Sequence, residues 1–299
     1  MSKVAKSRLR EARIGLLFLS PWLIGLAVFT AYPIIASLYF SFTHYSGLSS
    51  PRWAGLDNYV QLFKDPLFWK SIYNTLYLAI IGIPLAQVLS ILVALLLNTK
   101  VKFLGIFRTL YFLPSIVPAV ATALLWKWFL NPQFGPVNLL LEKIGLPTPG
   151  WLTDPAWSKP ALILTSVWGV GGAMVIYLAG LQNIPTELYE AAELDGAGKI
   201  ARLFTITLPM LSPVILFNVV MGIINSFQSF TSVFIMTGGG PENSTLVYAL
   251  SIYRNGFQFY KMGYASAMAW VLLIMTSIAI VFVFKFFGKY GYFGGVDKQ

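Results

Sequence analysis

Apolar residues along this chain gather into six long runs, and charged residues fall almost entirely in the segments between them. A helix that crosses a lipid bilayer needs about 20 apolar residues, a length that each run reaches. The bilayer core contains no water to hydrogen-bond the backbone, and a helix satisfies its backbone groups internally. Such runs are therefore expected to be helical. The pattern predicts an all-α membrane protein of one domain, residues 1–299, with six transmembrane helices at residues 14–42, 72–97, 104–126, 160–181, 208–236 and 263–284.

The first run, residues 14–42, follows a basic stretch and at first sight resembles a signal peptide. A secretory apolar region is about 7 to 15 residues long and ends at a small-residue cleavage site. This run is longer and continues through Pro33 into Ser41. We therefore expect it to remain attached as the first transmembrane helix.

The charged residues support a membrane protein and predict its orientation. Only 11% of residues are charged, against about 25% in soluble domains, which disfavours a water-soluble protein. The net charge of +10 could suggest nucleic acid as a partner, but membrane insertion explains it more simply. Of the 21 Lys and Arg residues, 13 fall in the alternating set of segments that contains both termini and seven fall in the other set. The bias predicts that both termini are cytoplasmic.

The residues that the usual catalytic and metal-binding sites require are missing from this sequence. There is no cysteine and His44 is the single histidine, so zinc clusters and the usual nucleophile–base arrangements are excluded. The phosphate-binding loop pattern also fails, because Ile200 follows Gly198-Lys199 and Glu193 stands where the first glycine belongs. We predict that the chain is not an enzyme, binds no cofactor or metal, and does not hydrolyse ATP alone.

The segment 184–209, between the fourth and fifth runs, is far more polar than its flanks and predicts a short helix pair on the cytoplasmic face. Thr186 can cap a helix that places acidic residues in its early turns, and Gly196 can end it. Ala191 and Ala192 would give this helix a small surface that fits closely into a partner's groove. An ordinary amphipathic helix at the membrane surface remains the alternative.

The same segment resembles the EAA motif of binding-protein-dependent ABC importer permeases, at Glu190, Ala191, Ala192, Gly196, Ile206, Leu208 and Pro209. The resemblance implies the fold of a type I ABC importer permease core, in which this loop is the coupling helix. In that family the helix docks in a cleft of the cytoplasmic ATPase, and its glutamate can pair with an ATPase arginine. Glu190 would have that role here.

Further landmarks extend the resemblance over nearly the whole chain, to the sugar-transport branch that includes the maltose and glycerol-3-phosphate permeases. They are Tyr32-Pro33, Gly55-Leu56-Asp57-Asn58-Tyr59, Leu113-Pro114, Trp151 to Pro155 and Thr237-Gly238-Gly239-Gly240-Pro241. The extra N-terminal helices and the large periplasmic insertion of the maltose permease have no counterpart here.

The resemblance also implies an assembly in the cytoplasmic (inner) membrane of a bacterium or archaeon. Its expected parts are a second permease subunit, usually a different chain, two ATP-binding subunits that hold ATP and Mg, and an extracytoplasmic substrate-binding protein. A carbohydrate and membrane lipid are the other expected partners, and nucleic acid is not one.

The substrate path is expected in the third to fifth helices. No Asp or Glu falls within the six predicted spans, which argues against a self-contained secondary transporter, and the lack of a cation favours a neutral substrate. Asn225, Ser226 and Ser229 can share one helix face toward a cavity, although polar groups also join neighbouring membrane helices. Similarity to the maltose permease nominates as sugar-contacting positions Ser115, Ala119, Thr165, Trp168, Gly169, Gly172, Asn225, Ser226 and Ser229.

Several alternatives stay open. Trp168 can offer a stacking face or pack in the interior, and Gly169 and Gly172 can serve close helix packing. For the whole chain, the alternatives to a permease are a secondary transporter or channel and a membrane scaffold that binds a cytoplasmic partner without transport. The intact EAA loop disfavours both. The sequence does not name the sugar.

Overall fold

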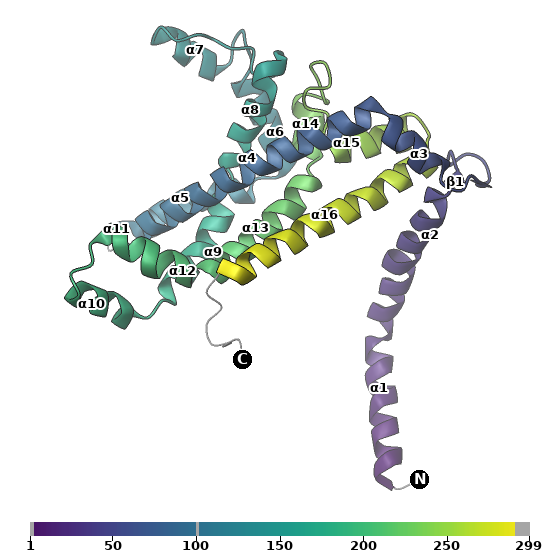
Figure 1. Cartoon of the computed structure of the whole chain (residues 1–299), viewed down its shortest axis with the longest axis horizontal. Coiled ribbons are helices and arrows are strands. Elements are labelled where there is room, and N and C mark those ends of the chain that lie inside the picture. Colours follow the sequence, from purple (N-terminus) through teal and green to yellow (C-terminus); the bar gives the residue numbers. More distant parts are fainter. Residues whose placement is uncertain (1–2, 100–101, 291–299) are drawn as a thin grey trace. The chain divides into compact units, whose positions relative to one another are not determined.

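The computed structural model describes residues 3–99 and 102–290, with side chains over 13–99 and 102–288, and is built almost wholly of helices (Figure 1). The chain forms two compact units: Met1–Lys64 with Ile252–Val271, and Asp65–Ser251 with Leu272–Gln299. The helix α16 (Met262–Tyr290) contributes residues to both. The all-α prediction is confirmed, whereas the single domain over the whole chain stays a prediction.

The first unit begins with a long helical stretch made of α1 (Lys3–Leu26), a π-helical turn (Ala27–Ala31) and α2 (Tyr32–Ser41). Its apolar side chains face outward, and Phe18 and Phe29 are 82% and 81% exposed. An apolar helix face that is this exposed is suited to contact with lipid or with another membrane helix. The stretch covers the predicted run 14–42 with a difference of one residue at its end.

A small cap follows this helix in the same unit. Strands β1 (Thr43–His44) and β2 (Arg52–Trp53) pair antiparallel with Thr43 opposite Trp53, and α3 (Asp57–Lys64) follows. The buried Asn58 donates hydrogen bonds to the carbonyls of Ser41 and Thr43, both at 2.9 Å. These bonds join α3 to the end of α2. The other part of the unit contains the end of α15 (Tyr248–Tyr253), a π-helical turn (Arg254–Gln258) and the start of α16.

The second unit is organised around α4 (Pro66–Leu97), which packs against α8, α9 and α13. Asp65 caps its start by accepting a hydrogen bond from the amide of Leu67 at 2.8 Å. The remaining elements of the unit are α5 (Leu104–Ile116), α6 (Ala119–Phe129), α7 (Pro136–Lys143), α8 (Pro155–Val167), α9 (Gly171–Gln182), α10 (Thr186–Leu194), α11 (Lys199–Arg202), a π-helical turn (Leu203–Thr207), α12 (Leu208–Met210), α13 (Ser212–Phe227) and α14 (Thr231–Met236).

Three of the predicted runs are broken rather than straight. Residues 104–126 form α5 and α6, which meet at 97°, residues 160–181 form α8 and α9 at 48°, and the stretch before α13 joins it at 65°. The first break has a clear cause, because Val117 precedes Pro118 and both residues adopt extended backbone angles. The run 208–236 is interrupted again between Phe227 and Thr231.

These breaks decide how many spans can be counted. Among the described residues, three helices are long and apolar enough to cross a membrane, at Arg13–Ser41, Pro66–Leu97 and Met262–Gly288. The number rises to six if each bent pair forms one span. The six-span count therefore stays a prediction that the structure accommodates.

A hydrophobic core forms where α4 and α9 lie side by side. Tyr177 and Met174 of α9 are fully buried there together with Ala94 of α4 and Leu211. Beside it, a Cβ atom added to Gly171 would meet the carbonyl oxygen of Tyr111 at 2.0 Å. Only glycine permits this approach of α9 to α5.

Candidate functional site

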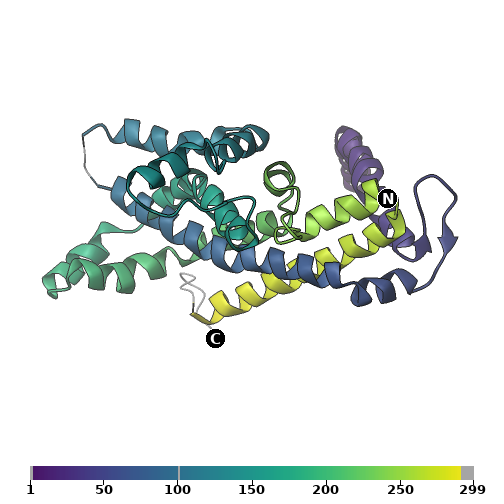
Figure 2. The same ribbon diagram turned by 90° about the horizontal axis from the view of Figure 1, so that it is seen from above.

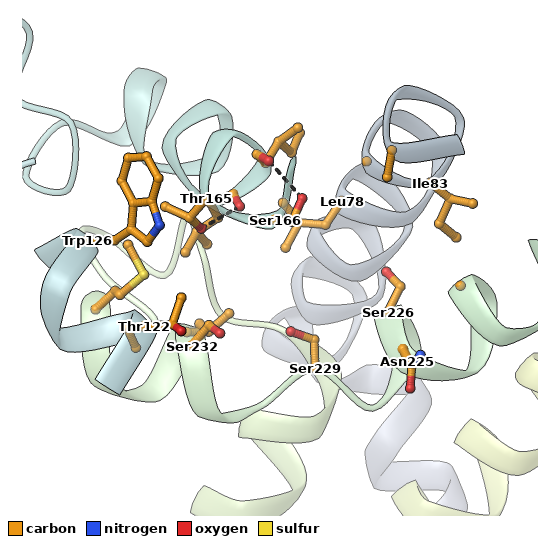
Figure 3. A pocket seen from close by; sticks show the side chains of 18 of the residues that line it. Leu78, Ile83, Thr122, Trp126, Thr165, Ser166, Asn225, Ser226, Ser229 and Ser232 are labelled. Atoms are coloured by element: carbon orange, nitrogen blue, oxygen red, sulfur yellow. Dashed lines mark hydrogen bonds between the residues drawn. The ribbon is translucent and has the colours of Figure 1, made fainter. Parts of the chain in front are cut away.

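A cavity of about 370 Å³ lies within the second unit, between α4, α6, α8, α13 and α14 (Figure 3). The breaks in the helices create it, because α6 and α14 turn away from the lines of α5 and α13 and pack against each other. Its lining combines aliphatic side chains with neutral polar ones and, as far as the structure describes it, carries no charged side chain. The polar and aromatic members are Gln87, Thr122, Trp126, Thr165, Ser166, Asn225, Ser226, Ser229 and Ser232.

Five of these polar side chains are available to a ligand. Asn225, Ser226, Ser229 and Ser232 follow one another from the end of α13 into α14, and Thr122 lies on α6 (Figure 3). Among the described residues, no group forms a hydrogen bond with these five side chains. Thr165 differs, because its hydroxyl donates to the carbonyl of Leu162 at 2.8 Å. The free amide and hydroxyl groups are the donors and acceptors that a neutral, hydroxyl-rich molecule would need.

Trp126 adds an unused donor to the cavity. Its indole Nε1 is buried and has no hydrogen-bond partner among the described residues. Its ring meets Trp168 edge to face, with centroids 6.0 Å apart at 80°. A buried donor without a partner costs roughly 1–3 kcal/mol, so a ligand that accepts this hydrogen bond would recover the loss.

A hydrogen-bonded glutamine forms one end of the cavity. The Gln87 side chain accepts from the hydroxyl of the buried Tyr177 and donates through Nε2 to the carbonyl of Asn218 at 3.3 Å. These bonds join α4, α9 and α13. Beyond them lies the hydrophobic core that supports the segment 184–209.

The segment 237–246 lies beyond the other end of the cavity. It contains a cis peptide at Gly240-Pro241 and is tied to its neighbours by buried hydrogen bonds. Ser244 bonds to Ser158 of α8 at 2.8 Å. Asn74 of α4 donates to the carbonyls of Asn243 and Leu246 at 2.9 and 3.1 Å. The segment thus covers the helices α4 and α8 one turn beyond the residues that line the cavity.

The structure brings together some of the predicted path residues and separates others. Thr165, Asn225, Ser226 and Ser229 line the cavity. The remaining five lie outside its lining. Among them, Gly172 faces Ser115, because a Cβ atom on Gly172 would come within 3.8 Å of the Ser115 side chain. The Trp168 ring contacts the lining residue Trp126. These five are Ser115, Ala119, Trp168, Gly169 and Gly172. Their contact with substrate stays a prediction.

Sequence reasoning missed other lining residues. Ser232 and Thr122 are reached only because α14 and α6 turn back at their breaks. Gln87 carried a usable signal, since it is an amide within an otherwise apolar run. No cluster of three or more metal-binding side chains is found among the described residues.

The segment 184–209 folds as the predicted pair of short helices. Helix α10 ends at Leu194, and Gly196, two residues later, has a φ of +77°, the left-handed conformation that favours glycine. The amides of Gly196 and Ala197 donate to the carbonyls of Glu193 and Ala192 at 3.0 and 2.8 Å, which completes a Schellman cap. The expected cap at the other end is wrong, because Thr186 is already the first helical residue and Pro185 precedes it without a side-chain hydrogen bond.

One face of this segment is anchored and the other is exposed. Tyr189 bonds to the Thr207 hydroxyl at 2.9 Å and packs with Ile206 against the core. Arg202 pairs with Glu193 at 2.9 Å. The outward side carries Glu190 and Ala191, both exposed, and three exposed apolar residues: Leu194, Ile200 and Phe204. Figure 2 shows α10 to α12 projecting together at one end of the second unit.

Broken apolar helices around a cavity lined by uncharged side chains, with an exposed helix pair at one end, define a multi-pass membrane protein of the permease class. Residues 67–290 match the family model of the binding-protein-dependent transport system inner membrane component. The chain belongs to this family.

Curated relatives and a solved structure cover nearly the whole chain. It is 40% identical to the probable ABC transporter permease protein YesP of Bacillus subtilis over 95% of this chain and 93% of that protein. It is 37% identical to the lactose transport system permease protein LacF of Rhizobium radiobacter over 88% and 90%. A chain of the bacterial alginate ABC transporter, solved with an alginate pentasaccharide-bound periplasmic protein, superposes with a TM-score of 0.83 at 26% identity, covering 95% and 97%.

Proposed function

We propose that this chain is a permease subunit of an ATP-driven importer and forms half of the path for a sugar or oligosaccharide that an extracytoplasmic binding protein delivers. The observation that carries the proposal is the uncharged cavity, in which five polar side chains and the indole donor of Trp126 have no hydrogen-bond partner among the described residues. Neutral hydrogen-bonding groups beside an aromatic ring suit a sugar. The relatives named for lactose and alginate support the same class of substrate.

The second part of the proposal concerns the exposed helix α10. We assign Glu190, Ala191 and Ala192 to contact with a cytoplasmic ATP-binding subunit, and Gly196, Ile206, Leu208 and Pro209 to holding the helix against the permease. The small alanine side chains and the exposed Leu194, Ile200 and Phe204 offer the apolar surface of an interface, and Glu190 offers a charge at its centre. Both termini and this loop lie in the cytoplasm in this proposal.

Transport then follows from alternating access. ATP binding closes the paired ATP-binding subunits, α10 follows them, and two permease subunits open outward to accept the sugar. Hydrolysis returns the path to the inward-open state. The thermodynamic requirement is that ATP and the loaded binding protein both favour the outward-open state. ATP and Mg are held by the partner subunits, and this chain contributes no catalytic group.

Reconstitution into liposomes tests the proposal. The complete set of two permeases, two ATP-binding subunits and the binding protein should accumulate sugar only when ATP is present on the cytoplasmic side. The purified chain alone should move no sugar along a concentration, proton or sodium gradient. Gradient-driven transport by the chain alone would show instead that it is a self-contained carrier.

A further inference from the structure

A lysine stands one helical turn beyond the lining of the cavity. Lys159 lies on α8, three and four residues before Leu162 and Ile163, which line the cavity. Residues at these spacings share a helix face, about 6 Å apart along the axis. The sequence pattern placed Lys159 outside the predicted span 160–181, but α8 begins at Pro155 and includes it.

The surroundings hold the ammonium group without neutralising it. The Nζ atom lies 4.6 and 4.8 Å from the ring centroids of Tyr73 and Tyr77, and 3.3 Å from Asn74 Oδ1. Asn74 is fully buried and its Nδ2 already donates to the segment 237–246, which turns its oxygen toward Lys159. Two aromatic rings and a fixed amide oxygen therefore position the charge.

No carboxylate of the described residues pairs with this charge. Lys70, one helical turn before Asn74, adds a second cation and donates to the backbone carbonyl of Glu242 at 2.6 Å. Arg202, in contrast, has the carboxylate of Glu193 as its partner. Lys159 lies in the second turn of α8, where a long side chain can carry its charge toward the membrane surface. The ammonium charge of Lys159 is therefore available to an anionic ligand.

From this arrangement we infer that Lys159, supported by Lys70, binds the carboxylate of an acidic sugar, so that the transported substrate is an anionic oligosaccharide. The inference rests on the proposed function and specifies its substrate. The ammonium supplies a point charge on a flexible stem that can follow the carboxylate toward the cavity. The uncharged side chains of the cavity bind the hydroxyl groups of the same sugar.

A purely structural role would make Lys159 a brace between α4 and α8, and the two roles predict different measurements. The probes are digalacturonate and its dimethyl ester, which differ in charge but have closely similar shape. Binding is measured by ligand-detected NMR on the purified permease and ATP-binding subunits without the binding protein. Wild type should bind the acid about tenfold more tightly than the ester, and added salt should reduce the difference.

The variants decide between the roles. Lys159→Met should weaken binding of the acid about tenfold and leave the ester unchanged, while Lys159→Arg should keep the preference for the acid. Lys143→Met, which removes an exposed lysine of α7, is the matched control and should behave as wild type. A Lys159→Met complex that keeps the full preference but unfolds at a lower temperature identifies a brace and overturns the inference.

Wild type that binds both probes equally, or neither, also overturns it. The proposed function is tested separately by ATP-dependent sugar uptake. An importer that accumulates sugar but shows no preference for charge would therefore refute only the anionic substrate.

Discussion

The segment 184–209 and the cavity are connected by the same helices, α9 and α13, but they are built in opposite ways. The segment exposes a glutamate and large apolar side chains, as a surface does when a partner is to cover it. The cavity encloses neutral polar groups and one unused donor, as a site does when a small molecule is to enter it. In the proposed function, energy transmission and substrate contact are therefore separate tasks of these two regions.

The two regions are physically linked through the core between them. Tyr189 and Ile206 of the segment pack on the cluster that contains Tyr177, and Tyr177 bonds to Gln87 at the end of the cavity. A movement of α10 can therefore reach the cavity through packed side chains. Separate tasks with a physical link are what an importer driven by a partner's ATP cycle requires.

The largest expected effect is on coupling. Glu190→Lys should reduce ATP-dependent sugar uptake by the complete importer roughly 5- to 150-fold, the usual range of coupling energies, because it reverses the charge at the proposed ATPase interface. Uptake and ATP hydrolysis are measured in the same liposomes. Glu187→Lys makes the same charge change in the first turn of α10, outside the motif, and should have a small effect. Full, ATP-coupled uptake by Glu190→Lys would remove this helix from the coupling role.

The next effect is on the scaffold between the regions. Gly171→Ala should lower the free energy of unfolding by about 1–3 kcal/mol, because its methyl group would overlap the carbonyl of Tyr111. Thermal unfolding of the purified protein in detergent measures this change. Gly172→Ala is the control, since its methyl group would meet Ser115 at an ordinary 3.8 Å. Equal stability of the two variants would show that α5 and α9 do not approach as described.

A smaller effect should be confined to the cavity. Trp126→Phe removes the unpaired indole donor, which favours the folded state, and also removes packed ring atoms, which disfavours it, so the free energy of unfolding should hardly change. The sugar concentration for half-maximal uptake should rise about fivefold, because a sugar hydroxyl loses its donor. Trp128→Phe is the matched control at an exposed position outside the lining. An unchanged half-saturation in Trp126→Phe would mean that the donor does not face the transported sugar.

The smallest effect should be at the end of α10. Gly196→Ala places a side chain at a φ of +77° and should destabilise this turn by about 1 kcal/mol, which lowers uptake by no more than a few-fold. Gly198→Ala should be neutral, because Gly198 has a φ of −71° and open space around its Cα. Hydrogen exchange of the α10 amides reports the local change. Equal exchange in both variants would contradict the left-handed turn.

The sequence predicted the segment 184–209 better than the cavity, for physical reasons. A helix stop at Gly196 is a local property of the chain, and a polar loop between apolar runs is visible in the composition. The cavity depends on where three helices break and fold back, which brings Thr122, Ser166 and Ser232 together from separate runs. Hydrophobic periodicity records the length of a run but not a bend within it.

Lys159 shows the same limitation at the level of one residue. The charge of Lys159 lies at the edge of an apolar run and therefore indicates a boundary of the span, so the pattern predicted that the helix begins after it. The structure extends α8 back to Pro155, with Asp154 as its cap through a 2.8 Å bond to the amide of Ala156. The sequence pattern left Lys159 outside the span and so favoured a neutral substrate. Because the structure includes Lys159 in α8, we infer an anionic substrate instead.

The separation of the two tasks is tested most directly by the amount of sugar imported per ATP hydrolysed, measured against sugar concentration for wild type, Glu190→Lys and Trp126→Phe in the complete importer. Glu190→Lys should lower the sugar imported per ATP at an unchanged half-saturating sugar concentration. Trp126→Phe should raise the half-saturating concentration and keep the wild-type ratio at saturation. If each variant changed both quantities alike, coupling and substrate contact would not be separate, and the account would be contradicted.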